Sequence, residues 1–330
     1  MKILYAVQAT GNGHISRAIE LLPHIQKYGE VDIFLSGNNA SLPSELPVKY
    51  KSKGVSLFYN KKGKLDYQKT LKQVNPSRIY KDARELPIKN YDLILNDFEY
   101  ICHSACKMMD VQMVHFGHQA SFASKKTPRP DKKDRLGEWV LRKYCKGDIN
   151  VGFHFDAYEP WILPPVIKQS LWKSVPQNNQ HITVYLPHYS EEVLEKAFKQ
   201  FKQIEFHIFS KERTFITREK NIYWHPIHSE LFNQSLLNCG GIITGAGFET
   251  PAESMFLGKK LMVLPIKGQY EQKCNAEAMK PFGTTIVKEI DEKFHQKLKK
   301  WLESKHDPML TPNFLPTDKI VEKAMEIILV

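Results

Sequence analysis

The sequence lacks the features that would mark a membrane or exported protein. No apolar run approaches the roughly 18 residues that a membrane-spanning helix needs. Residues 1–14 contain one short apolar run that leads directly into a glycine-containing loop, without the longer apolar stretch and small-residue cleavage site of an export signal. We therefore interpret residues 2–7 as a first core strand and expect a cytoplasmic protein.

Cysteine is also scarce, and its spacing does not suggest a disulfide framework. The five cysteines are Cys102, Cys106, Cys145, Cys239 and Cys274. An odd number in a chain of 330 residues favours reduced thiols. Cys102 and Cys106, with His103, His115 and His118 nearby, offer zinc-binding residue types but not the tight Cys-x-x-Cys spacing, so packing on one helix face fits them better.

The chain is long and basic. A length of 330 residues suggests two domains, and 42% hydrophobic with 25% charged residues is typical of a globular protein. The formal net charge of +11 favours anionic partners, which include nucleotides, phosphates, acidic lipid surfaces and nucleic acid. We expect no nucleic-acid partner, because the basic residues are not interleaved with aromatic residues and no helix-turn-helix or zinc-finger spacing is present.

Short apolar segments alternate with helical patterns along the whole chain. We expect strands at 2–7, 31–36, 55–60, 92–97 and 111–116, with helices from the first loop to about residue 28, at 67–84 and at 99–109. After a proline-rich stretch the pattern restarts, with strands at 181–187, 204–210, 221–224, 241–245 and 260–265 and with Ser190 as the N-cap of a helix. This alternation predicts an α/β protein with two Rossmann-like domains, residues 1–160 and 161–315, and a ligand cleft between them.

The first strand ends in a glycine-containing loop that is followed by a histidine. Gly11, Asn12, Gly13 and His14 do not form the dinucleotide fingerprint G-x-G-x-x-G, because Ser16 stands at its last position. The glycines still allow a ligand close to the backbone, and the positive end of the following helix favours a neutral imidazole, the state that a general base needs. Alternatively, His14 only caps or packs the turn.

A second loop, Gly245-Ala246-Gly247, follows the strand at 241–245. Thr250, Pro251 and Glu253 after it match a capping box, in which Glu253 would only satisfy a backbone N–H group. A glutamate in the first turn of a helix beside a phosphate-binding loop can instead accept hydrogen bonds from ribose hydroxyls. Spacing alone does not separate the two interpretations, although ligands of such sheets bind at the carboxyl ends of the strands.

The segment around this loop resembles the donor half of GT-B glycosyltransferases, in particular the enzymes related to MurG and the UDP-glycosyltransferases. The resemblance rests on residues 247–253, Gly258, and Glu271-Gln272 followed by Asn275-Ala276. It implies that Glu253 binds the donor ribose and that Glu271 and Gln272 bind the donor sugar.

Three further matches are shorter. The segment from Trp224 to Pro226 is similar to the W-x-P segment against which the base lies in these families, with Ile227 in place of the usual Gln. The loop that ends in His14 resembles the N-terminal loop whose histidine faces the acceptor. Asp97 matches the position where some UDP-glycosyltransferases place an aspartate that orients this histidine. The resemblance further implies that a last helix, within 316–330, packs back on the first domain.

The sequence departs from the family pattern at the diphosphate. Many UDP-glycosyltransferases have a histidine at the position of Gly245, so the diphosphate charge must be met here by backbone N–H groups and helix N-termini, with Thr244 or Thr250 as hydroxyl donors. No D-x-D carboxylate pair is present, and we expect no metal and no cofactor.

The resemblance implies an inverting glycosyltransferase. Its donor would be a nucleotide sugar, UDP-linked by resemblance, and its acceptor a saccharide or a lipid-linked molecule in cell-envelope or polysaccharide synthesis. His14 and Asp97 would be catalytic, although His14 and Gly11–Gly13 could instead bind an acceptor phosphate. A sugar-nucleotide epimerase or hydrolase, and a non-catalytic nucleotide-sugar-binding subunit, are the alternatives.

Residues 125–146 depart from the general pattern, with nine Lys or Arg and only three acidic residues. Within the segment, Leu136, Trp139, Val140 and Tyr144 recur at helical spacing. The favoured interpretation is a solvated loop followed by a helix that uses these four side chains as core. The second is a basic amphipathic element that rests on an anionic surface, such as the inner face of the cell membrane.

Overall fold

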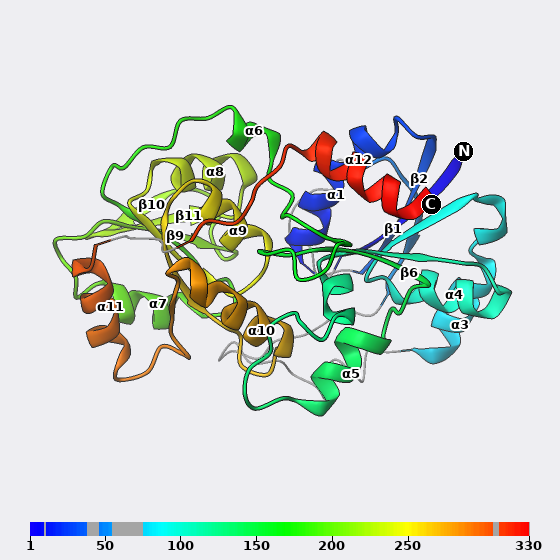
Figure 1. Cartoon of the computed structure of the whole chain (residues 1–330). Helices are drawn as coiled ribbons and strands as arrows, with labels where there is room; N and C mark the ends of the chain where they lie inside the picture. The colour runs from blue at the N-terminus through cyan, green and yellow to red at the C-terminus, as the bar shows by residue number, and fades with distance from the viewer. Residues whose placement is uncertain (10, 38–45, 55–74, 306–309, 330) are drawn as a thin grey trace. The chain divides into compact units, whose positions relative to one another are not determined.

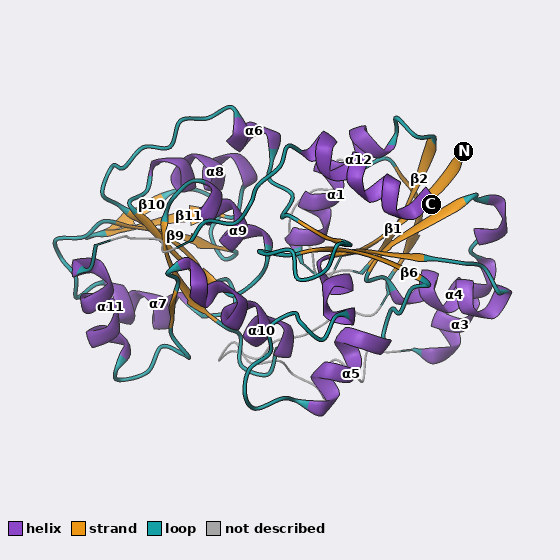
Figure 2. Ribbon diagram, viewed as in Figure 1, coloured by secondary structure: helices purple, strands orange, loops and turns teal. Residues whose placement is uncertain are grey.

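The structure is a computed structural model, and it describes residues 1–9, 11–37, 46–54, 75–305 and 310–329. The chain divides into two compact units. Unit 1 contains the described residues up to Ile167 together with those from Asn313 onward, and unit 2 contains the described residues Lys168–Pro312. The described residues of each unit form a seven-stranded sheet, drawn in orange in Figure 2.

The sheet of unit 1 has the strand order β3-β2-β1-β4-β5-β6-β7, and all of its neighbouring strands are parallel. Its strands are β1 (Lys2–Gln8), β2 (Glu30–Ser36), β3 (Val48–Ser52), β4 (Leu93–Asp97), β5 (Val114–Gly117), β6 (Ile149–Phe153) and β7 (Ile162–Leu163). The chain builds outward in one direction from β1 and in the other from β4. The two loops that follow these strands therefore diverge, and in sheets of this kind a ligand binds in the crevice at such a point, at the carboxyl ends of the strands.

Helices cover both faces of this sheet, as the near-continuous burial of β1 requires. They are α1 (Asn12–Ile25), α3 (Pro76–Glu85), α4 (Tyr100–Met109), α5 (Arg135–Lys143) and α12 (Thr317–Leu329), with short 3₁₀ helices at Ile88–Asn90 and His118–Ala123. In Figure 1, α12 packs beside α1 on one face, and α3 and α4 lie together on the other. The last helix of the chain therefore belongs to unit 1.

Unit 2 repeats the arrangement, with the strand order β10-β11-β9-β8-β12-β13-β14. Its strands are β8 (Ile182–Tyr185), β9 (Phe206–Ser210), β10 (Thr217–Glu219), β11 (Ile222–Pro226), β12 (Gly241–Gly245), β13 (Lys260–Leu264) and β14 (Thr285–Ile286). All neighbours are parallel except β10 and β11. The order reverses between β8 and β12, which marks the ligand crevice of this unit.

The helices of unit 2 also cover both faces of its sheet. They are α6 (Gln169–Trp172), α7 (Glu191–Phe198), α8 (Ser229–Asn238), α9 (Glu249–Phe256), α10 (Tyr270–Met279) and α11 (Phe294–Glu303), with a 3₁₀ turn at Lys280–Phe282. Phe198 of α7 and Phe294 and Trp301 of α11 share one buried cluster with the strands, so these two helices cover the same face. Figure 1 shows α8 and α9 on the opposite face.

The structure confirms most of the strands expected from the sequence. The expected strand at 55–60 lies outside the described residues, as does the first part of the expected helix at 67–84, whose remainder is α3. The domain boundary falls after Ile167 and not at residue 160, because β7 pairs with β6 and so extends the sheet of unit 1. Within the described parts of the chain, no helix has the length and apolar character to span a bilayer.

The expectation that residues 136–144 form a core-facing stripe is wrong in part. The helix exists as α5, capped by the Asp134 carboxylate, which accepts from two backbone N–H groups of its first turn. Leu136 and Trp139, however, are 58% and 56% exposed. Leu141, which is 4% exposed, faces the core instead, with Tyr144 half-buried beside it. The helix therefore turns part of its apolar stripe to solvent.

Candidate functional site

His14 and Asp97 lie at the crevice of unit 1, where the strand order reverses. His14 is in the first turn of α1, shortly after β1 ends, and Asp97 is the last residue of the neighbouring β4. In the register of the two strands Val7 lies beside Asp97. Because the strands are parallel, their carboxyl ends meet at one edge of the sheet, and this brings the two side chains together.

The two side chains are hydrogen-bonded. His14 Nδ1 lies 3.0 Å from Asp97 Oδ1, and the Asp97 side chain is fully buried while that of His14 is 14% exposed. An ionised carboxylate only accepts hydrogen bonds, so this contact requires the proton on Nδ1. Nε2 of His14 then carries a free lone pair, and it has no partner among the described residues. This is the arrangement that a general base needs.

Arg17, which was not among the predicted site residues, completes the cluster. Its Nη2 donates to both carboxylate oxygens of Asp97 at 2.8 Å. Nη2 also lies 3.1 Å from His14 Nδ1, but this approach is not a hydrogen bond when Nδ1 carries the proton, because both atoms are then donors. The Arg17 side chain is 2% exposed, so the ion pair is buried. A signal was available: His14 and Arg17 are three residues apart on one helix, a spacing that places two side chains on the same face.

The charge state of Asp97 follows from this geometry. Burial by itself raises the pKa of the carboxyl, but the charges of Arg17 and His14 outweigh it and lower the pKa to about 2. Asp97 is therefore ionised at neutral pH and stabilises a positive charge on His14 if the imidazole takes a proton.

Gly117, at the end of β5, fits against this cluster so closely that no side chain has room there. A Cβ at this position would lie 2.3 Å from Asp97 Oδ1 and 3.5 Å from Arg17 Nη2. Real Cβ atoms do not approach oxygen so closely, so glycine is required here for steric reasons and not for its backbone freedom.

The turn after Asp97 is held in an unusual conformation. Phe98 has a φ of 60°, a left-handed conformation that costs a non-glycine residue about 1 kcal/mol. The Asn96 side chain closes the turn by bonding both the backbone N–H and the C=O of Glu99, at 2.7 and 2.8 Å. The buried Glu99 carboxylate then caps α4 and accepts from Ser36 Oγ at 2.6 Å. These bonds fix the position of Asp97 at the crevice.

The glycine loop before His14 is partly described, since Thr10 lies outside the described residues. Gly11 is the N-cap of α1, which begins at Asn12, and no side chain caps this helix end. The N–H groups of the first turn, which includes Gly13, therefore lack helical acceptors. A Cβ on Gly11 would have nothing within 4 Å, so there is open space beside the loop.

The second glycine loop, Gly245–Gly247, lies at the crevice of unit 2, where β12 ends. The Gln272 side chain of α10 fixes it: Oε1 accepts from the backbone N–H groups of Ala246 at 3.2 Å and of Ile266 at 2.9 Å. Asn275 Nδ2 donates to Ala246 O at 3.1 Å. The amide Nε2 of Gln272 has no partner among the described residues, so it can donate to a ligand.

Other predicted donor-site residues lie around this loop. A Cβ on Gly247 would have nothing within 4 Å, so a ligand has room there. Glu271, half-buried, is in the first turn of α10 beside Gln272. Thr244 is unsuited to binding phosphate, because it is 2% exposed and its hydroxyl donates to Tyr185 O at 3.1 Å.

The capping-box interpretation of Glu253 is wrong. Helix α9 begins at Glu249 with Phe248 at the N-cap and no side-chain cap, so Thr250 lies inside the helix. Glu253 is 3% exposed, and its Oε1 lies 3.0 Å from Lys168 Nζ. Lys168 also donates to Asn233 Oδ1 at 3.1 Å. The carboxylate is thus held by a lysine and not by its own backbone.

Lys168 was not identified from the sequence, because it lies in the proline-rich stretch that separates the two series of predicted strands. It binds one carboxylate oxygen of Glu253, while the other oxygen, Oε2, has no partner among the described residues. A buried carboxylate with one oxygen neutralised and one open is a suitable acceptor for ligand hydroxyls.

The Trp224 ring does not form an open stacking surface. It is 1% exposed in the core cluster of unit 2, and the guanidinium of Arg213 lies 5.1 Å above it. The ring therefore supports β11 from within. This leaves Ile227, half-buried directly after β11, as the predicted residue of this segment that can face a ligand.

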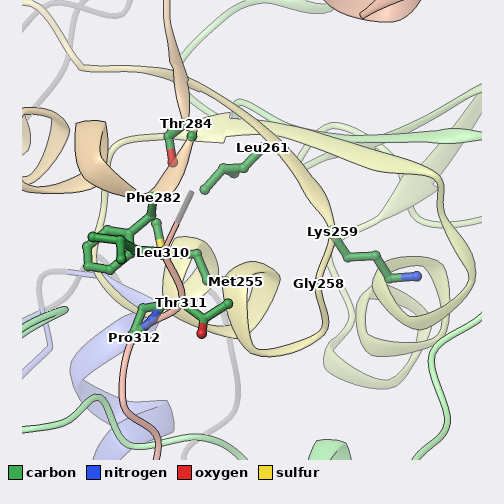
Figure 3. A pocket seen from close by; sticks show the side chains of 10 residues that line it. Met255, Gly258, Lys259, Leu261, Phe282, Thr284, Leu310, Thr311 and Pro312 are labelled. Atoms are coloured by element: carbon green, nitrogen blue, oxygen red, sulfur yellow. The ribbon is translucent and has the colours of Figure 1, made fainter. Parts of the chain in front are cut away.

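Two further features bear on bound groups. Among the described residues, no three His, Cys, Asp or Glu side chains are arranged to hold a metal ion. A hollow of about 30 Å³ lies beside α9, lined by Met255, Phe282 and Leu310 among others, while Lys259 points away from it (Figure 3). Its volume suffices for about one water molecule, so it is not the donor site.

Several solved structures have the same fold as this protein. The structure matches a spinosyn forosaminyltransferase, SpnP, with a TM-score of 0.57 and 14% identity over 100% of this chain and 95% of that one. It matches Arabidopsis thaliana UGT89C1, solved with UDP, with a TM-score of 0.56 and 14% identity over 98% and 94%. It also matches Acinetobacter baumannii MurG, with a TM-score of 0.51 and 13% sequence identity over 98% of this chain and 94% of that one. These likenesses establish the GT-B fold.

A comparison with curated proteins returns no match. The family profile described as glycosyl transferase family 1 matches residues 1–304, which is most of the chain. The expected fold and the expected enzyme class are thereby confirmed. The protein belongs to glycosyl transferase family 1.

Proposed function

We propose that this glycosyltransferase transfers a sugar from a nucleoside-diphosphate sugar to an acceptor hydroxyl with inversion, and that His14 is its general base. The observation that carries this proposal is the hydrogen bond of 3.0 Å between His14 Nδ1 and Asp97 Oδ1, at the crevice of unit 1. It fixes the imidazole so that Nε2 is the basic nitrogen.

The proposed reaction is a single displacement. His14 Nε2 takes the proton of the acceptor hydroxyl, and the resulting oxygen attacks the anomeric carbon of the donor. The bond from that carbon to the diphosphate oxygen breaks, and the diphosphate leaves with the electron pair. Asp97 remains ionised and stabilises the imidazolium of His14. General-base assistance of this kind contributes about 10²–10⁴-fold to the rate.

The donor is proposed to lie at the crevice of unit 2. Glu253 Oε2 accepts from the ribose hydroxyls, and Gln272 and Glu271 bind the sugar hydroxyls. The backbone N–H group of Gly247 and the N-terminus of α9 face the diphosphate, which favours negative charge at that position. No metal is invoked, because these groups supply the positive potential that the leaving diphosphate needs.

The nucleotide is proposed to be UDP, by analogy with UGT89C1, whose structure was solved with UDP. The acceptor is proposed to be a saccharide or a lipid-linked molecule at the inner face of the cell membrane.

The test distinguishes a role of His14 in proton transfer from a role in donor binding. In a screen of UDP-sugars against saccharide and lipid-linked acceptors, His14→Ala is expected to lower turnover about 10²–10⁴-fold and to leave the Kd for UDP near that of the wild type. The exposed Glu230→Gln serves as a control and should alter neither quantity. NMR of the product should show an inverted anomer.

Three outcomes would overturn the proposal. A retained anomer excludes the single displacement. A collapse of UDP affinity in His14→Ala assigns the imidazole to donor binding. Steady formation of an epimer from the UDP-sugar without acceptor makes the protein an epimerase on the same scaffold.

A further inference from the structure

Helix α5 and the loop before it leave an exposed apolar pair among unpaired cations. Leu136 and Trp139, on successive turns of α5, are 58% and 56% exposed. Seven basic side chains of the segment are exposed and form no ion pair among the described residues: Lys125, Lys132, Lys133, Arg135, Arg142, Lys143 and Lys146. A protein surface rarely presents a large aromatic and a leucine side by side without a partner.

The helical geometry concentrates these groups on one face. Residues three or four apart share a helix face, so Arg135, Arg142 and Lys143 flank Leu136 and Trp139 on the outer side of α5. The buried Leu141 marks the opposite side, toward the core. The outer face thus combines apolar tips with long cationic side chains and bears no acidic residue.

The acidic residues of the segment do not neutralise this face. Glu138 pairs with Arg129, and Asp134 accepts from the backbone of the first turn. The third acidic residue, the exposed Asp131, lies in the loop before α5 and not on the outer face of the helix. Arg129 also donates to the carbonyls of Thr127 and Phe122, which anchors the loop to unit 1. The loop before α5 is therefore tied to unit 1, and the outer face of the helix keeps its positive charge.

We propose that the outer face of α5 docks on an anionic lipid bilayer, with Leu136 and Trp139 entering the headgroup boundary and the flanking cations bound to acidic headgroups. Tryptophan favours the membrane interface, and lysine and arginine extend their apolar stems there while their charges remain at the headgroups. This docking does not depend on sugar transfer, so it can be tested separately from the proposed function.

The experiment is co-sedimentation of the full chain with phosphatidylcholine vesicles that contain or lack phosphatidylglycerol. We expect binding that requires phosphatidylglycerol and weakens with salt. Each cation near an anionic surface contributes about five-fold to partitioning, so Arg142→Glu with Lys143→Glu should lower binding more than about ten-fold. Leu136→Ser with Trp139→Ser should lower it comparably.

Matched controls lie in unit 2. Lys299→Glu with Lys300→Glu reverses two exposed charges of α11, and Phe215→Ser removes an aromatic that is 69% exposed. Both should bind as the wild type does. The fluorescence of Trp139, isolated by difference with Trp139→Phe, should shift to the blue on phosphatidylglycerol vesicles.

Several results would overturn the proposal. One is equal binding to neutral vesicles, and another is an equal loss of binding in the α11 variant. A third is an apolar double variant that still binds vesicles but loses turnover with an acceptor, which would assign Leu136 and Trp139 to acceptor binding. Because the two double variants alter different side chains, misfolding of one leaves the other as a test.

Discussion

Asp97→Asn is the perturbation whose consequence follows most directly from the structure. The substitution keeps the shape of the side chain and removes its charge. Arg17, whose side chain is 2% exposed, would then carry a buried charge without a counter-charge. Removing one partner of a buried ion pair typically costs about 3–5 kcal/mol. Only the oxygen of the asparagine amide can accept a hydrogen bond, whereas both oxygens of the carboxylate do. At least one hydrogen bond from Arg17 or His14 is therefore lost as well.

The double variant Arg17→Met with Asp97→Asn tests the origin of this cost. It leaves neither charge buried, and we expect it to be less destabilised than Asp97→Asn alone. The assay is urea-dependent hydrogen exchange of peptides from β1 and β4, which reports the free energy of unfolding of unit 1 by itself. A cost below about 1 kcal/mol for Asp97→Asn, or a double variant that is less stable than the single one, would refute the buried ion pair as the origin.

The same carboxylate makes the stability of unit 1 depend on pH. Its pKa in the folded chain, about 2, lies below the value of about 4 for an unfolded chain. The lowered pKa stabilises the folded state of unit 1 fully above pH 4. This contribution, about 3 kcal/mol to the free energy of unfolding, is lost as the pH falls through 2. The loss should be absent in Asp97→Asn.

Three other substitutions test separate parts of the account. In Gly117→Ala the new Cβ would lie 2.3 Å from Asp97 Oδ1, so the carboxylate must move. We expect turnover to fall about 10²-fold while the Kd for nucleotide stays unchanged. Unaltered turnover would contradict the steric argument. In Lys168→Met the Glu253 carboxylate loses its counter-charge. Nucleotide affinity, measured by calorimetry, should therefore fall about ten-fold. A Kd equal to that of the wild type would show that the lysine is dispensable. His225 is 7% exposed with both ring nitrogens unpartnered among the described residues, and burial lowers its pKa to about 4. His225→Phe should therefore keep or raise the stability of unit 2. It should also reduce the loss of stability that the wild type undergoes as the pH falls from about 6.5 to about 4. A destabilised variant would show that the ring of His225 has a stabilising partner.

The position of the candidate base could be predicted because local signals determine it, whereas its catalytic role and that of Asp97 came from the family resemblance. An apolar strand, a glycine loop and a helix start place His14 at a sheet edge, and the same reasoning places Asp97 at the end of another strand. Their adjacency additionally needs β1 and β4 to be neighbours, which follows from the reversal of strand order in this fold. Arg17 was within reach of the same reasoning through its spacing from His14.

The remaining features depend on tertiary packing. Lys168 meets Glu253 only after unit 2 has folded, because the two residues are far apart in sequence. The capping box failed because α9 begins before Thr250, at Glu249, with the buried Phe248 at its N-cap. Amphipathic spacing located α5 correctly, but it could not show that Leu136 and Trp139 face solvent while Leu141 faces the core. Strands of two residues, such as β7 and β14, carry no periodic signal.

Unit 2 is proposed to hold a nucleoside diphosphate sugar through Glu253. Calorimetric titration of the wild type and of Glu253→Gln with UDP and with 2′-deoxy-UDP tests this proposal most directly. We expect the wild type to bind UDP about ten-fold more tightly than 2′-deoxy-UDP, and Glu253→Gln to lose most of this preference. Equal affinities of the wild type for the two nucleotides, or an unchanged preference in the variant, would contradict the role of Glu253 in binding the ribose.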